Sequence, residues 1–331
     1  MKRAGRAEPT VRAKIKLSAF INPRPSADEL LFLRQLGVSH CYTWLPDELT
    51  TYDYLARLAD QVSRAGLSLY NVGNMSLGKS PRIHLGAAGR DDDIARFAQF
   101  LRDLSRAGIH TTTFTWEPDR VWSSAPGSSR HARARSVDLA DLKARPLTQG
   151  REYSLDELWE NFAYFMRAII PVAEATGVRL ALHPNDPPTD ALGGVPCLIN
   201  SRERYERAFA IADSPALGME FCTGCWLEGG DAFGDMLAAI PHYLAARRIL
   251  IVHFRNVSAT LPAFTETFLD NGYFDMYQAM KALVAGGYDG TIILDHTPVF
   301  ADDYHPGAGT AYAIAYMRAL IERAEDELSR D

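Results

Sequence analysis

Short apolar runs alternate along the chain with longer stretches in which polar and apolar residues are mixed. Strands buried in a parallel sheet are nearly continuous apolar and β-branched runs, because helices cover both faces of such a sheet. The sequence predicts eight strands of this kind, at residues 15–20, 38–44, 67–72, 109–116, 178–183, 217–222, 249–254 and 291–295.

The stretches between these runs carry the signals of helices. Ser26 and Ser154 are each followed three residues later by a glutamate, which is the spacing of a capping box at a helix start. Glycine stands directly before the second, third, fourth and fifth predicted strands, where a helix can end in the left-handed conformation that suits this residue. These glycines are Gly37, Gly66, Gly108 and Gly177.

Eight strands alternating with helices predict the α/β class and, within it, a single (β/α)8 TIM barrel over residues 1–331. A doubly wound open sheet is the alternative. An open sheet that binds dinucleotides would show G-x-G-x-x-G after its first strand, and residues 15–25 contain no such motif.

A long insertion, residues 117–154, follows the fourth predicted strand and is rich in Ser, Arg, Pro and Gly. Irregular segments of this length in compact domains are often functional. We expect a lid or an oligomer contact, and the alternative is a solvated surface loop.

Composition excludes several classes of partner. The net charge is −6, and the basic residues do not form the cluster that neutralises nucleic acid. No apolar run approaches the ~20 residues that cross a bilayer, and no apolar segment follows the charged N-terminus. We therefore expect a cytoplasmic protein without a nucleic-acid or membrane partner. Its four cysteines are too few for a disulfide framework.

Four consecutive predicted strands end at or next to a residue that can bind a metal ion: His183, Cys222, His253 and Asp295. The carboxyl ends of barrel strands meet around one site, so these side chains are expected to converge. Two imidazoles, a thiolate and a carboxylate suit divalent zinc, manganese, iron or cobalt. Singly, each residue has a structural explanation, such as a cysteine that packs as a small hydrophobe. Their recurrence favours a metal site.

Cys222 also opens a C-x-x-C motif with Cys225, a spacing found in redox pairs and structural zinc sites. A structural zinc site would need a second ligand pair, which the chain lacks. We interpret Cys225 as part of the pocket wall. After His183, the prolines of "HPNDPP" (183–188) restrict the backbone and are expected to hold Asn185 and Asp186 over the pocket.

The motifs "ALHPNDPP", "EFCTG", "VHFRNV", "DMYQAMKAL" and "LDH", together with residues 81–109, resemble the mannonate dehydratase family. The resemblance implies a xylose-isomerase-like barrel and a hydro-lyase of carbohydrate metabolism that converts a mannonate-like sugar acid into a 2-keto-3-deoxy acid. It also implies Mn²⁺ as the ion, with Zn²⁺, Fe²⁺ and Co²⁺ left open. The family's metal ligands fall on His183, Cys222, His253 and Asp295.

Such a dehydration removes the proton α to a carboxylate and expels the β-hydroxyl. A divalent ion stabilises the negative charge that both steps place on oxygen. His296, beside a ligand, is the expected acid/base, with an orienting role as the alternative. Asp186 and Tyr304 are the further catalytic candidates.

Arg255 follows the ligand His253, and its guanidinium suits a substrate carboxylate. The alternative is an arginine that secures the barrel rim. The other residues expected to bind substrate are Asn256, Asn185, Trp116 and Trp122.

The chain departs from the family pattern around the substrate. Asn185 stands where the family reads "HPDDPP", and Ala308 stands where a tyrosine follows Pro-Gly, with Tyr304 as a nearby replacement. Phe268 lies near an expected histidine, and Trp122-Ser123-Ser124 replaces an expected arginine. A metal-dependent sugar isomerase or epimerase, a lyase of an oxidised sugar and a non-catalytic sugar-binding barrel therefore stay open. The expected partners are a small sugar acid or sugar derivative and further copies of the chain in a homo-oligomer.

Overall fold

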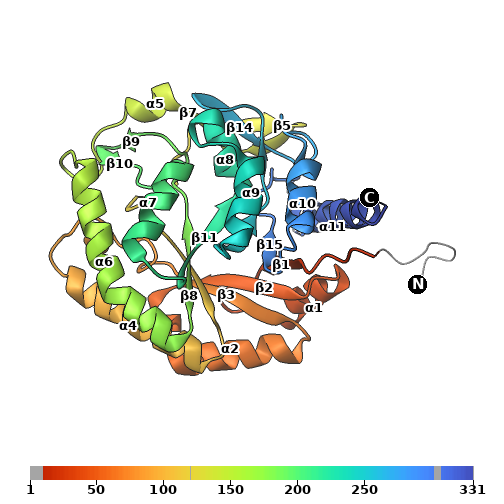
Figure 1. The fold of residues 1–331 in the computed structure, drawn as a ribbon, viewed down its shortest axis with the longest axis horizontal. Coiled ribbons are helices and arrows are strands. Elements are labelled where there is room, and N and C mark those ends of the chain that lie inside the picture. Colours follow the sequence, from red (N-terminus) through yellow and green to blue (C-terminus); the bar gives the residue numbers. More distant parts are fainter. Residues whose placement is uncertain (1–9, 120, 302–306, 331) are drawn as a thin grey trace.

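Eight parallel strands form a nearly closed barrel in the computed structural model, which describes residues 10–119, 121–301 and 307–330. The strand order is β3-β2-β1-β15-β12-β11-β8-β4, and helices surround the strands (Figure 1). The predicted (β/α)8 barrel is confirmed, and each predicted strand overlaps an observed one. The barrel strands are β1 (Lys16–Phe20), β2 (His40–Leu45), β3 (Ser68–Asn74), β4 (Thr111–Thr115), β8 (Arg179–His183), β11 (Leu217–Cys222), β12 (Ile249–His253) and β15 (Thr291–Ile293).

One long helix follows each barrel strand. Among the helices in the described part of the chain, none is long and apolar enough to cross a membrane. The eight helices are α1 (Ala27–Gln35), α2 (Tyr52–Arg64), α4 (Arg90–Arg106), α6 (Leu155–Thr176), α7 (Arg202–Ala212), α9 (Met236–Ala245), α10 (Met276–Ala285) and α11 (Ala308–Leu328).

The helix ends follow the local sequence signals. At the start of α6, the Glu157 amide donates to Ser154 Oγ, and Glu157 Oε2 accepts from the Ser154 amide at 2.6 Å, which completes the predicted capping box. At the start of α1, Ser26 likewise accepts from the Glu29 amide. The Glu29 carboxylate accepts from the Asn22 amide instead, so the capping box at Ser26 is incomplete. All four predicted helix-ending glycines have positive φ, from 66° to 76°.

The ring closes between β3 and β4 through side chains. Thr112 Oγ1 donates to the Val72 carbonyl at 2.7 Å, and Asn71 Nδ2 donates to Thr113 Oγ1 at 2.8 Å. Threonines on β4 therefore supply bonds at the one junction that the barrel's backbone ladders leave open.

The insertion at residues 117–154 has more regular structure than its composition indicated. It holds a hairpin of β5 (Gly127–Ser129) and β6 (Ala132–Ala134), then β7 (Ser136–Asp138) and the short helix α5 (Leu139–Lys143). Strand β7 pairs antiparallel with β14 (Ala263–Thr267), which itself pairs with β13 (Asn256–Val257). These strands gather at one end of the barrel, at the top of Figure 1. The insertion is thus built into the rim, and its role as a lid or subunit contact stays a prediction.

The remaining elements are short and lie in the connections. They are α3 (Pro81–His84), α8 (Thr223–Gly229), the 3₁₀ turns at Asp47–Leu49 and Gly230–Ala232, and the two-stranded ribbon of β9 (Ala191–Leu192) and β10 (Val195–Pro196).

Replacing the capping serine should destabilise the protein measurably. Ser154→Ala leaves the Glu157 amide without its side-chain acceptor, so we expect the free energy of unfolding to fall by about 1 kcal/mol in urea denaturation. Ser63→Ala, at an exposed position inside α2, is the matched control and should cost nothing, because alanine favours helix. Equal effects of the two changes would contradict the capping role.

Candidate metal centre

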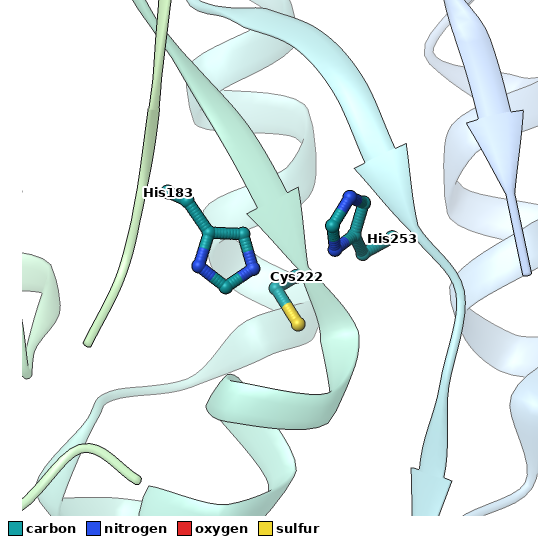
Figure 2. A group of neighbouring side chains, drawn as sticks. All are labelled: His183, Cys222 and His253. Atoms are coloured by element: carbon teal, nitrogen blue, oxygen red, sulfur yellow. The ribbon is translucent and has the colours of Figure 1, made fainter. Parts of the chain in front are cut away.

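Three of the predicted ligands converge at the carboxyl ends of β8, β11 and β12. One ligand atom each from His183, Cys222 and His253 lies within 4.8 Å of the others. In Figure 2 the two imidazole rings flank the Cys222 side chain. The ring centroids of His183 and His253 are 4.9 Å apart. We call these three residues the ligand cluster.

Asp295, the fourth predicted ligand, lies at the edge of the ligand cluster, two residues beyond β15. Its Oδ1 is 3.3 Å from His253 Nδ1, and its Oδ2 is 3.7 Å from Cys222 Sγ. The residue has a φ of 55°, a left-handed conformation that aspartate tolerates better than most residues. This turn directs the carboxylate toward the ligand cluster.

The surroundings favour deprotonated sulfur at this position. Burial opposes ionisation of Cys222, but a hydrogen bond with Cys225 and the charge of Arg255 hold its pKa well below the ordinary value. Thiolate is the form that binds metal ions. His253 Nδ1 is buried, and Asp295 is the carboxylate near it. A thiolate, two imidazoles and a nearby carboxylate fit a divalent transition ion.

Sequence reasoning missed a carboxylate beside the ligand cluster. Glu220 is 2% exposed, and its Oε1 lies 2.6 Å from His253 Nε2. It stands two residues before Cys222 on β11, so both side chains project from the same face of the strand. The alternation in "LGMEFC" was the signal that could have identified it.

A pocket of about 250 Å³ opens beside the ligand cluster at the carboxyl ends of the strands. His183, His253, Glu220, Asp295 and His296 line one side of it. The other side, which we call the second wall, comes from β1 to β4 and the residues that follow β3 and β4. The second wall comprises Phe20, Tyr42, Trp44, Lys79, Thr113, Thr115 and Glu117.

His296 lies where the predicted acid/base should be. It lines the pocket with 45% of its side chain exposed, and its Nδ1 is 2.9 Å from Glu266 Oε1 on β14. The Asp295 carboxylate, opposed by burial and assisted by Glu266, raises the pKa of His296 to about 9. Sequence reasoning did not identify Glu266, because β14 lies outside the barrel strands.

Arg255 is engaged with protein carboxylates and is not among the residues that line the pocket. Its side chain is fully buried, and four carboxylates surround the guanidinium. Nη2 lies 2.9 Å from Asp186, Nη1 contacts Glu228 and Glu266, and Nε lies 2.9 Å from Asp295. Burial opposes its charge, but these carboxylates raise the pKa of Arg255 well above the ordinary value. The alternative prediction, an arginine that secures the rim, matches the geometry.

The two asparagines predicted to bind substrate instead hold loops. Asn256 is buried and donates from Nδ2 to the carbonyls of Leu269 and Phe274. Asn185 donates to the Trp116 carbonyl and accepts from the Ile199 amide. Each amide is therefore engaged with backbone, and neither residue is among those that line the pocket, so their role in substrate binding stays a prediction.

The two tryptophans predicted to bind substrate are packed against other side chains. Trp116 is fully buried, and its ring packs against those of His84 and Phe162. Trp122 is 9% exposed and lies under the Arg145 guanidinium. Neither residue is among those that line the pocket. Trp116 packs against α6 through Phe162, and Trp122 packs within the insertion through Arg145.

Asp186 lines the pocket but is a poor candidate for a base. Arg135 of the insertion and Arg255 lie 2.8 and 2.9 Å from its oxygens. Burial would raise the pKa of Asp186, but these two charges hold it well below the ordinary value. Cys225 is buried with Asp186 and Glu228 and does not form the pocket wall. Tyr304 lies outside the described residues.

The sequence model described as D-mannonate dehydratase (UxuA) matches residues 134–330, which is more than half of the chain. The chain belongs to the mannonate dehydratase family. The mannonate dehydratase of Enterococcus faecalis is 28% identical over 327 residues, covering 86% of this chain and 90% of that protein. The crystal structure of mannonate dehydratase from Streptococcus suis serotype 2 matches with a TM-score of 0.83 at 25% identity, covering 96% and 95% of the two chains.

A xylose isomerase-like TIM barrel from Mycobacterium smegmatis, solved in complex with magnesium, shares the fold at a TM-score of 0.56 and 15% identity, with 94% of this chain and 98% of that chain covered. These comparisons confirm the predicted family, the xylose-isomerase-like barrel and the enzyme class, a carbon–oxygen hydro-lyase.

The buried position of Arg255 makes a clear prediction for stability. Arg255→Met leaves several buried carboxylates without their counter-charge, so we expect the free energy of unfolding to fall by about 3–5 kcal/mol. Arg130→Met removes a similar pair with Asp270 at the surface, where a loss below about 1 kcal/mol is expected. Urea denaturation of both variants measures the difference, and a mild effect of Arg255→Met would contradict the role assigned to this residue.

Proposed function

We propose that the protein is a metal-dependent dehydratase that removes water from D-mannonate or a closely related sugar acid. The observation that carries the proposal is the convergence of His183, Cys222 and His253, with Asp295 at their edge. Membership of the mannonate dehydratase family supports the reaction class. The product would be a 2-keto-3-deoxy acid.

The ligand cluster and Asp295 would hold the ion. When bound, a divalent ion supplies a Lewis acid that stabilises negative charge on substrate oxygens. The mixture of nitrogen, sulfur and carboxylate donors suits manganese, zinc, iron or cobalt better than an all-oxygen ion such as calcium. The family resemblance favours Mn²⁺ among them.

His296 would carry the proton transfer. Its ring lines the pocket beside Asp295 and is half exposed, so a bound sugar acid could reach it. Loss of water removes the α-proton and adds a proton to the departing β-hydroxyl. As acid/base, the His296 imidazole would accept the first at Nε2 and, as imidazolium, would supply the second from the same atom. Its Nδ1 faces Glu266 at 2.9 Å, whereas its Nε2 lies 3.6 Å from Asp295 and would be the ring atom that meets the substrate.

Glu266 would act as a positioning residue for His296. Its carboxylate meets Nδ1 of the ring and is itself held by Arg255 and by Arg135, whose Nη1 lies 3.0 Å away. The hydrogen bond fixes the tautomer and the orientation of the ring. The insertion thereby contributes to the site through Arg135.

Metal content is the first test. We expect about one equivalent of a divalent transition ion in the purified wild type by elemental analysis under reducing conditions. Cys222→Ser and His183→Ala should lose it, because each removes one donor from the cluster. Cys197→Ser is the matched control, since Cys197 is also a buried free thiol but lies outside the cluster.

Incubation of the metal-loaded protein with D-mannonate and related sugar acids then separates the reactions by mass. Loss of 18 mass units, about one water, indicates dehydration, whereas a changed product of equal mass indicates an isomerase or epimerase. A wild type that is metal-free and takes up no added Mn²⁺ would overturn the metal-dependent proposal and favour a sugar-binding barrel.

The role of Glu266 predicts a specific kinetic pattern. Glu266→Gln should lower kcat about 10- to 100-fold with little change in KM and full metal content, because the ring loses its orienting carboxylate. His296→Gln should lower kcat by about 10²–10⁴. The double variant should be no slower than His296→Gln alone, since both changes remove one function. Additive losses would show that Glu266 acts independently of His296.

A further inference from the structure

An ion pair lies in the second wall of the pocket, on the residues that follow β3 and β4. Lys79 Nζ is 3.1 Å from Glu117 Oε2. Lys79 follows β3 and Glu117 follows β4, whereas the ligand cluster ends β8, β11 and β12. In the strand order, β1 to β4 form one half of the barrel and the strands of the ligand cluster and Asp295 lie in the other. The pair and the metal site therefore approach the pocket from different halves.

The pair is poorly explained by stability alone. The Glu117 side chain is 8% exposed and that of Lys79 is 32% exposed. Desolvation offsets much of the attraction in such a pair, so it adds little to folding. Both side chains line the pocket and remain within reach of a bound molecule.

The neighbouring groups extend this polar surface. Thr113, Thr115 and Glu117 stand at alternate positions along β4 and beyond it, so they face the pocket together. The hydroxyl of Thr115 is buried and has no hydrogen-bond partner among the described residues. Trp44 adds an aromatic surface to the same wall. The wall thus offers an ammonium donor, a carboxylate acceptor and a free hydroxyl beside an apolar ring.

This set of groups matches the hydroxyl-bearing end of a sugar acid. Each hydroxyl can both donate and accept, so it can use Lys79 and Glu117 at once. A substrate carboxylate at this wall would instead be repelled by the negative charge of Glu117. We infer that Lys79 and Glu117 bind the hydroxyl groups remote from the substrate carboxylate and so determine which chain lengths the enzyme accepts. The inference rests on the proposed function and takes the carboxylate end of the substrate to face the ligand cluster.

A cycle of variants and chain lengths tests the inference. The parent is the Mn²⁺-loaded His296→Gln protein, in which slow turnover limits consumption of the ligand during calorimetric titration. The two ligands are D-mannonate and the four-carbon aldonate with the same configuration at C2 and C3, which lacks the distal hydroxyls. We expect Lys79→Met and Glu117→Gln to weaken D-mannonate binding about tenfold and to leave the short acid unchanged. Metal content should stay at the parent's level.

Lys281→Met is the matched control, because Lys281 forms a comparable pair with Glu327 between α10 and α11. It should change neither affinity. Equal losses for both acids, no loss for either, or a parent that binds neither acid would overturn the inference.

Water release by the wild type is measured separately. If the chain-length preference disappears in the variants but no water is released, the dehydration fails and the inference stands. If water is released and the preference persists, only the inference fails.

Discussion

The burial of one guanidinium constrains the whole carboxyl-end rim of the barrel. A fully buried arginine must be surrounded by opposite charge, and Arg255 meets this need with four carboxylates. They come from the loop after β8, from α8, from β14 and from the turn after β15. Four connections far apart in the sequence are thereby held at one point, and one of the carboxylates, Asp295, is also a candidate ligand.

This constraint extends outward to the insertion and inward to the backbone. Arg135 joins the same carboxylates from the segment between β6 and β7, so the insertion is electrostatically part of the site. On the inner side, a Cβ at Gly224 would lie 2.2 Å from Arg255 Nε. Only glycine leaves room there for the guanidinium, which gives the glycine of "EFCTG" a steric explanation.

The fold and the ligand cluster could be predicted because both depend on local signals. Apolar runs, caps and glycine stops set the strands and helices, and barrel geometry then brings His183, Cys222 and His253 together. The substrate contacts could not be predicted in the same way. Arg255 and Asn185 look like binding residues in sequence, but their partners lie on segments that only the tertiary structure brings near.

Some residues that line the pocket were not predicted from the sequence, for the same reason. Glu220 was recoverable from strand alternation, whereas Lys79 and Glu117 lie 38 residues apart and form a pair only because β3 and β4 close the ring. Nothing in the local sequence around either residue marks it as part of a pocket.

The two sides of the pocket also divide the chain along its length. The second wall lies entirely within residues 20–117, before the segment 134–330 that matches the family's sequence model and contains the ligand cluster, Asp295 and His296. Changes in the first third of the chain can therefore alter what enters the pocket without touching the residues that would perform the chemistry. Such a division allows a lineage to acquire new substrates while it keeps an old reaction.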